Sequence, residues 1–153
     1  MCNFSAALLD VIVGRTDVVP AVNQVEVHPY FTQETLRNRH EQFGIATQAW
    51  SPIGGVMRYW DDAPEASMDP LRDPVIVEIA ETHEKTAAQV MLRWHLKHGH
   101  SAIPKSVHTA RIAENFDVFD FTLTDDEVAA IDALDTGTRG GPDPETIDTE
   151  TYG

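Results

Sequence analysis

Cysteine, basic side chains and long apolar runs are all scarce in this sequence. Cys2 is the one cysteine, which excludes an intramolecular disulfide and fits a reducing compartment such as the cytoplasm. Eleven Lys and Arg face 25 Asp and Glu, so the net charge of −14 argues against nucleic acid or an anionic membrane as partner. No apolar run approaches the roughly 20 residues of a membrane span. The first ten residues lack the basic and apolar regions of a signal peptide, so we expect no secretion signal.

Length and composition describe about one globular domain with an acidic end. The chain has 153 residues, of which 42% are hydrophobic and 24% charged, a globular rather than a disordered profile. Residues 114–153 carry twelve acidic side chains and a single basic one, Arg139. An anionic ligand would therefore be held by residues 1–113 or at their edge, because the acidic end repels it.

Periodicity and stop signals alternate between strand and helix along the chain. The alternation implies parallel strands with right-handed crossovers, the α/β class. No G-x-G-x-x-G turn follows a strand, so a doubly wound dinucleotide fold is not expected. Three strands leave open edges, which indicates part of a larger α/β sheet or barrel. The predicted strands are 19–28, 45–50 and 101–105, the predicted helices are 8–13, 36–43, 75–80, 87–99, 109–119 and 124–134, and 54–73 is predicted as a loop.

The first predicted strand carries polar side chains on one face. Gln24, Glu26 and His28 are spaced by two and share that face, while Val25 and Val27 share the other. Three polar groups on a central strand need hydrogen-bond partners or a wet cavity. We interpret Glu26 and His28 as a buried hydrogen-bond network and Gln24 as a ligand contact.

Two further segments could contact a ligand. Trp50 and Ser51 end the second strand, where α/β proteins place ligands; the alternative is a core tryptophan followed by a simple turn. Lys105, Ser106 and Arg111 form a basic cluster at a strand end and a helix start. Such a cluster suits a phosphate, and the alternative is a pair of solvated charges that balance the acidic end.

Three histidines close together invite a metal interpretation. His95, His98 and His100 lie at the end of one predicted helix, but no cysteine or carboxylate completes a ligand set. We therefore predict that they are cations at a helix C-terminus and expect no metal.

Six stretches together resemble the aldo-keto reductase family, in particular bacterial members that reduce small keto and aldehyde substrates. The resemblance is collinear from about Cys2 to the end of the chain. The matching stretches are CNF at 2–4, PAVNQVEVHPYF at 20–31, GIATQAWSPIG at 44–54, AAQVMLRWHLKHG at 87–99, IPKSVHTARIAENFDVFDFTLT at 103–124 and RGGPDPETID at 139–148.

The resemblance implies part of a (β/α)8 TIM barrel. The chain would supply the end of the fifth strand and then the last three strands with their helices, since a whole barrel needs about 250 residues. Residues 1–135 would form the cofactor-binding half and residues 136–153 a C-terminal tail. The family's catalytic Asp, Tyr, Lys and His lie on earlier strands, so no catalytic residue is assigned here; Tyr30, Tyr59, Tyr152 and Lys105 do not match them.

The resemblance also implies NADPH as cofactor, bound through three groups of contacts. Lys105 and Arg111 suit a phosphomonoester, the 2′-phosphate that NADPH carries and NADH lacks, so NADPH is favoured over NADH. The implied residues are Asn3 and Gln24 for the nicotinamide carboxamide, Trp50 for stacking on its ring, Ser51, Ile53 and Gly54 for the pyrophosphate, Lys105, Ser106 and Arg111 for the 2′-phosphate, and Glu114 and Asn115 for the adenine.

Three hypotheses for function stay open at this point. The first is an NADPH-dependent oxidoreductase that reduces a small-molecule carbonyl to an alcohol in the complete protein. The second is a truncated, non-catalytic fragment with at most weak NADPH binding. The third is an α/β module that binds protein through its open edges, by which the chain could also self-associate. Trp60 and Tyr152 are the aromatic candidates for a substrate pocket wall.

Overall fold

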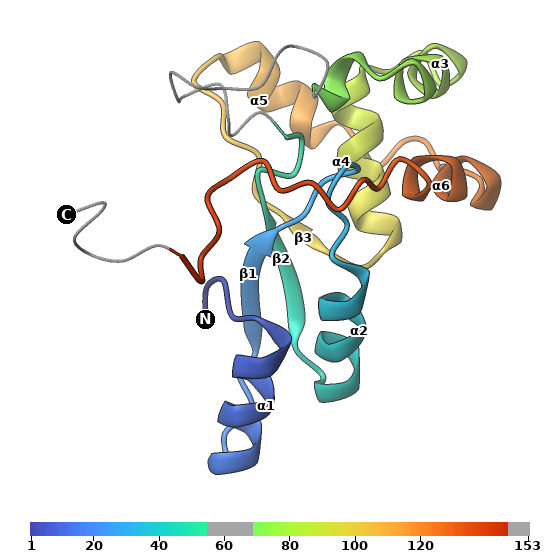
Figure 1. Cartoon of the computed structure of the whole chain (residues 1–153). Helices are drawn as coiled ribbons and strands as arrows, with labels where there is room; N and C mark the ends of the chain where they lie inside the picture. Colours follow the sequence, from blue (N-terminus) through green and yellow to red (C-terminus); the bar gives the residue numbers. More distant parts are fainter. Residues whose placement is uncertain (55–68, 147–153) are drawn as a thin grey trace.

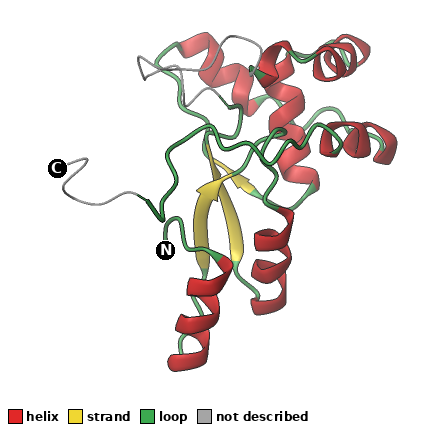
Figure 2. Cartoon of the chain, viewed as in Figure 1, coloured by secondary structure: helices red, strands yellow, loops and turns green. Residues whose placement is uncertain are grey.

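The computed structural model describes residues 1–54 and 69–146 as a small parallel sheet flanked by helices (Figures 1 and 2). This arrangement agrees with the α/β class expected from the alternating pattern. The strands are β1 (Val22–Glu26), β2 (Ala46–Trp50) and β3 (Ser101–Ala102). The helices are α1 (Ala6–Arg15), α2 (Glu34–Phe43), α3 (Pro74–Thr82), α4 (Ala87–Lys97), α5 (Thr109–Phe116) and α6 (Asp125–Asp132), with a short 3-10 helix at Pro70–Arg72.

The sheet has the order β1-β2-β3, and both pairs are parallel. Two strands are shorter than predicted. The strand predicted at 19–28 spans Val22–Glu26, and the strand predicted at 101–105 spans Ser101–Ala102. Pro20 and Pro104 explain part of this difference, since proline has no N–H to donate to a ladder.

One edge of the sheet is less open than expected. Cys2 pairs in parallel with Gln24, whose N–H donates to the Met1 carbonyl at 3.0 Å. The Asn3 N–H donates to the Gln24 carbonyl at 2.8 Å. Residues 1–3 thus continue the sheet beyond β1, as the end of a further strand would. On the other edge, β3 has no outer strand partner among residues 1–54 and 69–146.

The patterns Thr86-x-x-Gln89 and Thr124-x-x-Glu127 predict a capping box at the start of α4 and of α6, and both form. Thr86 accepts from the Gln89 N–H at 3.3 Å, and its own N–H donates to Gln89 Oε1 at 3.0 Å. Thr124 and Glu127 do the same at the start of α6. These short-range contacts satisfy N–H groups that a helix start would otherwise leave without partners.

The core lies between the sheet and the helices that cover it. Val25 and Val27 are buried, and so are Glu26 and His28 on the opposite face of the same strand. Burial on both faces is typical of a strand in a parallel sheet. Other buried apolar side chains in the core include Leu9, Ile76, Val90, Met91, Trp94, Leu123 and Ile131.

The prediction of one helix over 109–119 is wrong at its C-terminal end. Helix α5 stops at Phe116, and Phe119 lies beyond it. The chain leaves the helix at Asp117, whose carbonyl accepts from Gln89 Nε2 at 2.7 Å and whose carboxylate pairs with Lys85 at 3.0 Å. These contacts from outside α5 hold Asp117 in a non-helical conformation.

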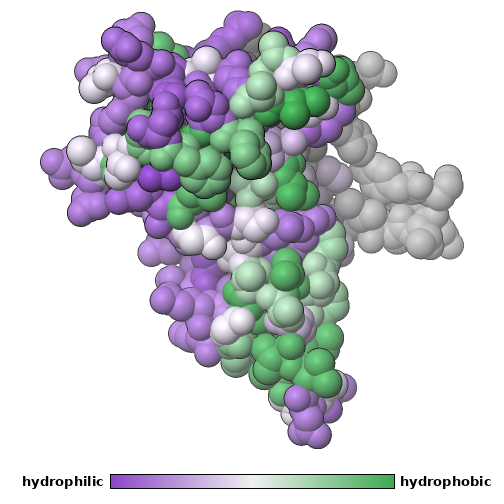
Figure 3. Space-filling model, turned by 180° about the vertical axis from the view of Figure 1, so that it is seen from behind, coloured by the Kyte–Doolittle hydropathy of each residue, from purple (hydrophilic) through white to green (hydrophobic). Residues whose placement is uncertain are grey.

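Large apolar side chains remain on the surface. Phe116 is 78% exposed and Phe119 65%, and Leu8 and Val11 of α1 are about half exposed. Figure 3 shows hydrophobic surface on the face turned away in Figure 1, both in the upper part and around the lower end. Exposed apolar patches of this kind are typical of protein interfaces. Self-association of the chain stays a prediction. No helix among the described residues is long and apolar enough to cross a membrane.

Candidate functional site

The stretch of chain before α1 and the end of β2 bring two predicted site residues into contact. Trp50 Nε1 donates to Asn3 Oδ1 at 2.8 Å, although 47 residues separate them. Asn3 adopts a positive φ of 55°, a conformation that asparagine tolerates better than most residues. The stub of chain before α1 and the last residue of β2 therefore form one polar corner at the carboxyl edge of the sheet.

Gln24 belongs to a polar ladder across three strands. Its Nε2 donates to Gln48 Oε1 at 2.6 Å, and Gln48 Nε2 donates to Ser101 Oγ at 3.2 Å. The three residues share one face of the sheet because Gln24 stands opposite Gln48 and Gln48 opposite Ser101. That Gln24 also contacts a ligand stays a prediction.

Glu26 anchors the C-terminal segment, a role that the sequence did not indicate. Its fully buried carboxylate accepts from the Gly140 N–H at 2.6 Å and the Gly141 N–H at 3.0 Å, and Arg139 lies 3.5 Å away. His28 Nε2 is 3.1 Å from the same carboxylate, so the predicted buried network exists. This network joins residues 139–141 to β1 and does not connect neighbouring strands of the sheet.

The same segment packs against Trp50. A Cβ added at Gly141 would lie 2.7 Å from the Trp50 ring and 3.3 Å from the Glu26 carboxylate. Only glycine leaves room there. The Gly140-Gly141 pair after an arginine is the signal that could have pointed to this close approach.

A tight turn follows Trp50. The Gly54 N–H donates to the Ser51 carbonyl at 2.8 Å, with Pro52 as the second residue of the turn. Ser51 has φ 47° and Gly54 φ 70°. Gly54 also presses on Pro70, where a Cβ would come within 2.6 Å of the proline ring.

A cavity of about 470 Å³ gathers six of the predicted site residues. They come from the turn after β2, from the segment after β3, and from α5, with the start of α4 as a further wall. The six are Ile53, Lys105, Ser106, Arg111, Glu114 and Asn115. Glu114 is held from the α4 side, because its carboxylate accepts from the Thr86 hydroxyl at 2.6 Å.

The N-terminus of α5 opens into this cavity without a side-chain cap or an acidic residue. Its cap residue, His108, makes no side-chain cap bond, and the first turn holds no acid. Arg111 lies in that turn instead, and both Arg111 and Lys105 are exposed. Within residues 1–54 and 69–146 neither cation forms an ion pair. A helix N-terminus carries partial positive charge, so this arrangement favours a bound anion.

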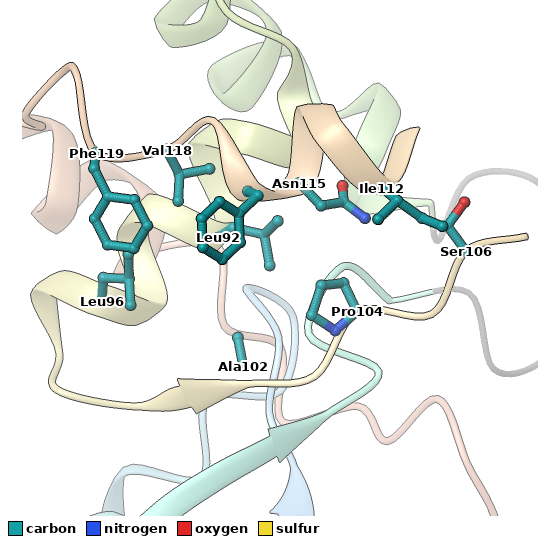
Figure 4. Close-up of a pocket in the computed structure, with 10 residues that line it drawn as sticks. Leu92, Leu96, Ala102, Pro104, Ser106, Ile112, Asn115, Val118 and Phe119 are labelled. Atoms are coloured by element: carbon teal, nitrogen blue, oxygen red, sulfur yellow. The ribbon is translucent and has the colours of Figure 1, made fainter. Parts of the chain in front are cut away.

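An apolar groove adjoins the cavity and shares Ser106 and Asn115 with it. Figure 4 shows Ser106 at one end of the groove, Leu96 and Phe119 at the other, and Asn115 between them. The groove encloses about 350 Å³ between α4, α5 and β3. It places the predicted phosphate-contacting segment next to an apolar surface.

The prediction that the histidines are cations at a helix C-terminus is wrong for two of them. His95 and His100 are buried, with His95 Nδ1 3.2 Å from His100 Nδ1. Burial, aided by nearby cations and imidazoles, lowers the pKa of His95 to about 3 and that of His100 to about 2. Both are therefore neutral near pH 7. His98 lies at the end of α4 and pairs with Asp132 at 2.9 Å.

No group of three or more potential ligands suited to a metal is found in the described part of the chain.

The Tyr30 hydroxyl donates a hydrogen bond to the Asp73 carboxylate at 2.7 Å. Burial, as the larger cause, and this hydrogen bond both raise the pKa of Tyr30. A raised pKa makes Tyr30 a weaker acid. Tyr59, Trp60 and Tyr152 lie outside the described residues.

The collinear motifs find their match in a known family. The model of the aldo/keto reductase family matches residues 1–136. This chain belongs to that family. The sequence resemblance is thereby confirmed, together with a partial barrel as the fold.

Named relatives and solved structures agree with this assignment. Morphine 6-dehydrogenase of Pseudomonas putida is 53% identical over 99% of this chain and 52% of its own length. A solved structure of Gox0644 in its apo form has a TM-score of 0.83 at 43% identity, covering 96% of this chain and 50% of that one. The aldo-keto reductase of Bombyx mori, solved with NADP, has a TM-score of 0.82 at 36% identity, covering 99% of this chain and 47% of that one.

The chain spans about half the length of the relatives that it matches. The neighbours solved with NADP or NADPH show that the family binds this nicotinamide cofactor. The division at residue 135 and the contact made by each site residue stay predictions.

Proposed function

We propose that this chain is the cofactor-binding part of an NADPH-dependent carbonyl reductase of the aldo-keto reductase family. The observation that carries the proposal is the anion-favouring cavity at the start of α5. Two cations without ion-pair partners in the described chain, Lys105 and Arg111, line it beside a helix N-terminus that no side chain caps. Lys105, Ser106 and Arg111 would hold the 2′-phosphate of the cofactor.

The remaining contacts follow from where the structure places the other predicted residues. Glu114 and Asn115 line the same cavity and would contact the adenine, and Ile53 would lie along the pyrophosphate. Ser51 and Gly54, in the turn that Ile53 shares, would complete the pyrophosphate contacts.

The nicotinamide end would lie at the carboxyl edge of the sheet. Asn3 and Gln24 would bond the carboxamide, and Trp50, already fixed by its bond to Asn3, would stack on the ring. A ring so held would present one face to a small-molecule carbonyl substrate. Bound NADPH supplies the hydride; the residues named here bind and orient it.

Arg111→Ala is expected to weaken NADPH binding by roughly 10- to 100-fold while leaving NADH affinity nearly unchanged. A charge-assisted contact to the 2′-phosphate contributes roughly 1.5–3 kcal/mol, which corresponds to this change in Kd. Titration of the chain with NADPH, NADH and 2′-phospho-AMP measures the preference directly.

Arg39→Ala is the matched control, because Arg39 is an arginine of α2 that pairs with Asp10 of α1 and is not among the described residues that line the cavity. It should change neither affinity. Equal loss of NADPH and NADH binding in Arg111→Ala would show that Arg111 is structural, and the phosphate assignment would fail.

The chain alone is expected to show no measurable NADPH-dependent reduction of a reactive aldehyde. The family resemblance places the catalytic Asp, Tyr, Lys and His on earlier strands, so the developing alkoxide has no assigned proton donor. Absence of reduction with retained NADPH binding indicates a cofactor-binding part. Absence of reduction with at most weak NADPH binding indicates the alternative, a truncated non-catalytic fragment. Steady oxidation of NADPH by the pure chain with aldehyde would contradict the prediction.

A reducing compartment such as the cytoplasm is part of the same proposal, since Cys2 is the one cysteine and the family's cofactor is a reductant. Association of the chain with a second copy would use the outer edge of β3 and the exposed side chains around Phe116 and Phe119.

A further inference from the structure

A line of three polar side chains crosses the core and ends at the turn after β2. Arg37 Nη1 of α2 lies 3.4 Å from His100 Nε2. His100 Nδ1 lies 3.2 Å from His95 Nδ1, and His95 Nε2 lies 2.9 Å from the Pro52 carbonyl. His95 is fully buried and His100 only 6% exposed. Four separate segments of the chain are joined by these contacts.

The chemistry of the two ends fixes the direction of every hydrogen bond in the line. The Pro52 carbonyl can only accept, so His95 Nε2 carries a proton and donates it. Because His95 is neutral, its Nδ1 is then the acceptor, and His100 Nδ1–H must be the donor. His100 Nε2 is left without a proton and accepts from Arg37, which can only donate. One arrangement of protons therefore satisfies the whole line.

The turn at the end of this line needs an external contact. Ser51 has φ 47°, in the left-handed region that is unfavourable for a residue other than glycine. The turn's own hydrogen bond, from the Gly54 N–H to the Ser51 carbonyl, closes it on one side. The bond from His95 to Pro52 fixes the middle of the turn from the core.

We propose that His95, oriented by His100 and Arg37, is a positioning residue that holds the 51–54 turn in place. His95 Nε2 donates to the Pro52 carbonyl. The tautomer of His95 is set through His100 by Arg37 of α2, at the far end of the line. That the held turn then meets the pyrophosphate rests on the proposed function; the positioning itself does not.

Hydrogen exchange of the Gly54 amide tests the positioning without any ligand. His95→Leu removes the donor, so Gly54 should exchange about tenfold faster, the factor that one hydrogen bond of ordinary net strength corresponds to. The rate is normalised to the Met91 amide inside α4, which corrects for a change in global stability. His95→Gln keeps an N–H donor near the position of Nε2 and should restore most of the protection.

His40→Leu is the matched control. His40 is also buried and hydrogen-bonded, but to Asn23 and Thr47 rather than to the turn. It should leave the Gly54 to Met91 ratio unchanged. Arg37→Met breaks only the outer end of the line and should raise the ratio less than His95→Leu, so it provides the test if His95→Leu does not fold.

An unchanged ratio in His95→Leu, or in Arg37→Met if His95→Leu does not fold, would overturn the proposal. So would an equal rise in His95→Gln and His95→Leu. A parallel NADPH titration separates the two proposals. If the unmodified chain fails to bind NADPH while His95→Leu still loosens Gly54, the proposed function fails and the positioning role stands.

Discussion

Between pH 7 and pH 5 the free energy of unfolding is expected to fall by roughly 5 kcal/mol, because three histidines that are buried and neutral in the folded chain bind protons in the unfolded chain. His40 has its pKa lowered by burial to about 4, His95 to about 3 and His100 to about 2. The folded chain thus keeps all three neutral at pH 5. In the unfolded chain an imidazole binds a proton near pH 6.5.

The direction of the effect follows from which state binds more protons. Below pH 6.5 the unfolded chain is protonated at these three positions and the folded chain is not, so acid favours unfolding. Each histidine contributes a loss of roughly 2 kcal/mol by pH 5. The stability that they provide is complete above about pH 6.5. The combined loss is comparable with the 5–15 kcal/mol that stabilises a typical domain.

Urea unfolding at pH 5, 6, 7 and 8 measures this dependence. His100→Gln should flatten the slope by about one proton, whereas His108→Gln, at an exposed position, should leave it unchanged. A free energy of unfolding that stays constant from pH 8 to pH 5 would show that the three imidazoles are not buried in their neutral form.

Glu26→Ala is expected to lower the free energy of unfolding by roughly 3–5 kcal/mol and to release the C-terminal segment. The buried carboxylate accepts from both the Gly140 and Gly141 N–H groups and lies beside Arg139. Alanine leaves all of these donors without their acceptor in the core. Glu26→Gln retains one oxygen of the same size and should lose less.

Trypsin reports the release, because Arg139 is the one basic residue among 114–153. Cleavage after Arg139 should accelerate in Glu26→Ala under conditions where the chain remains folded. Cleavage after Lys105, an exposed residue outside the contact, serves as the internal reference and should keep its rate. Equal rates at Arg139 in both proteins would mean that Glu26 does not hold the segment.

Features that depend on short stretches of sequence could be predicted. The capping boxes at Thr86 and Thr124 form as expected, since each needs only residues three apart. The cavity around Lys105 and Arg111 was also within reach, because the residues from Lys105 to Asn115 are continuous and begin where a strand ends.

Features that depend on contacts with distant residues could not be predicted from the sequence. The neutral state of His95 and His100 depends on packing against α2 and the 51–54 turn, neither of which is visible in the spacing of the histidines. The end of α5 at Phe116 depends on Lys85 and Gln89 binding Asp117. In both cases a long-range contact overrides a pattern that was correct locally.

The bond between Glu26 and Gly141 joins positions 115 residues apart, and this separation affects how the chain is made. During synthesis from the N-terminus, β1 leaves the ribosome long before residues 139–141 exist. Until they emerge, the Glu26 carboxylate has none of its glycine N–H donors, and burying it costs free energy. The contact also closes a loop of 115 residues, and contacts of such long range form slowly. Final packing of β1 therefore has to wait until residues 139–141 have been translated.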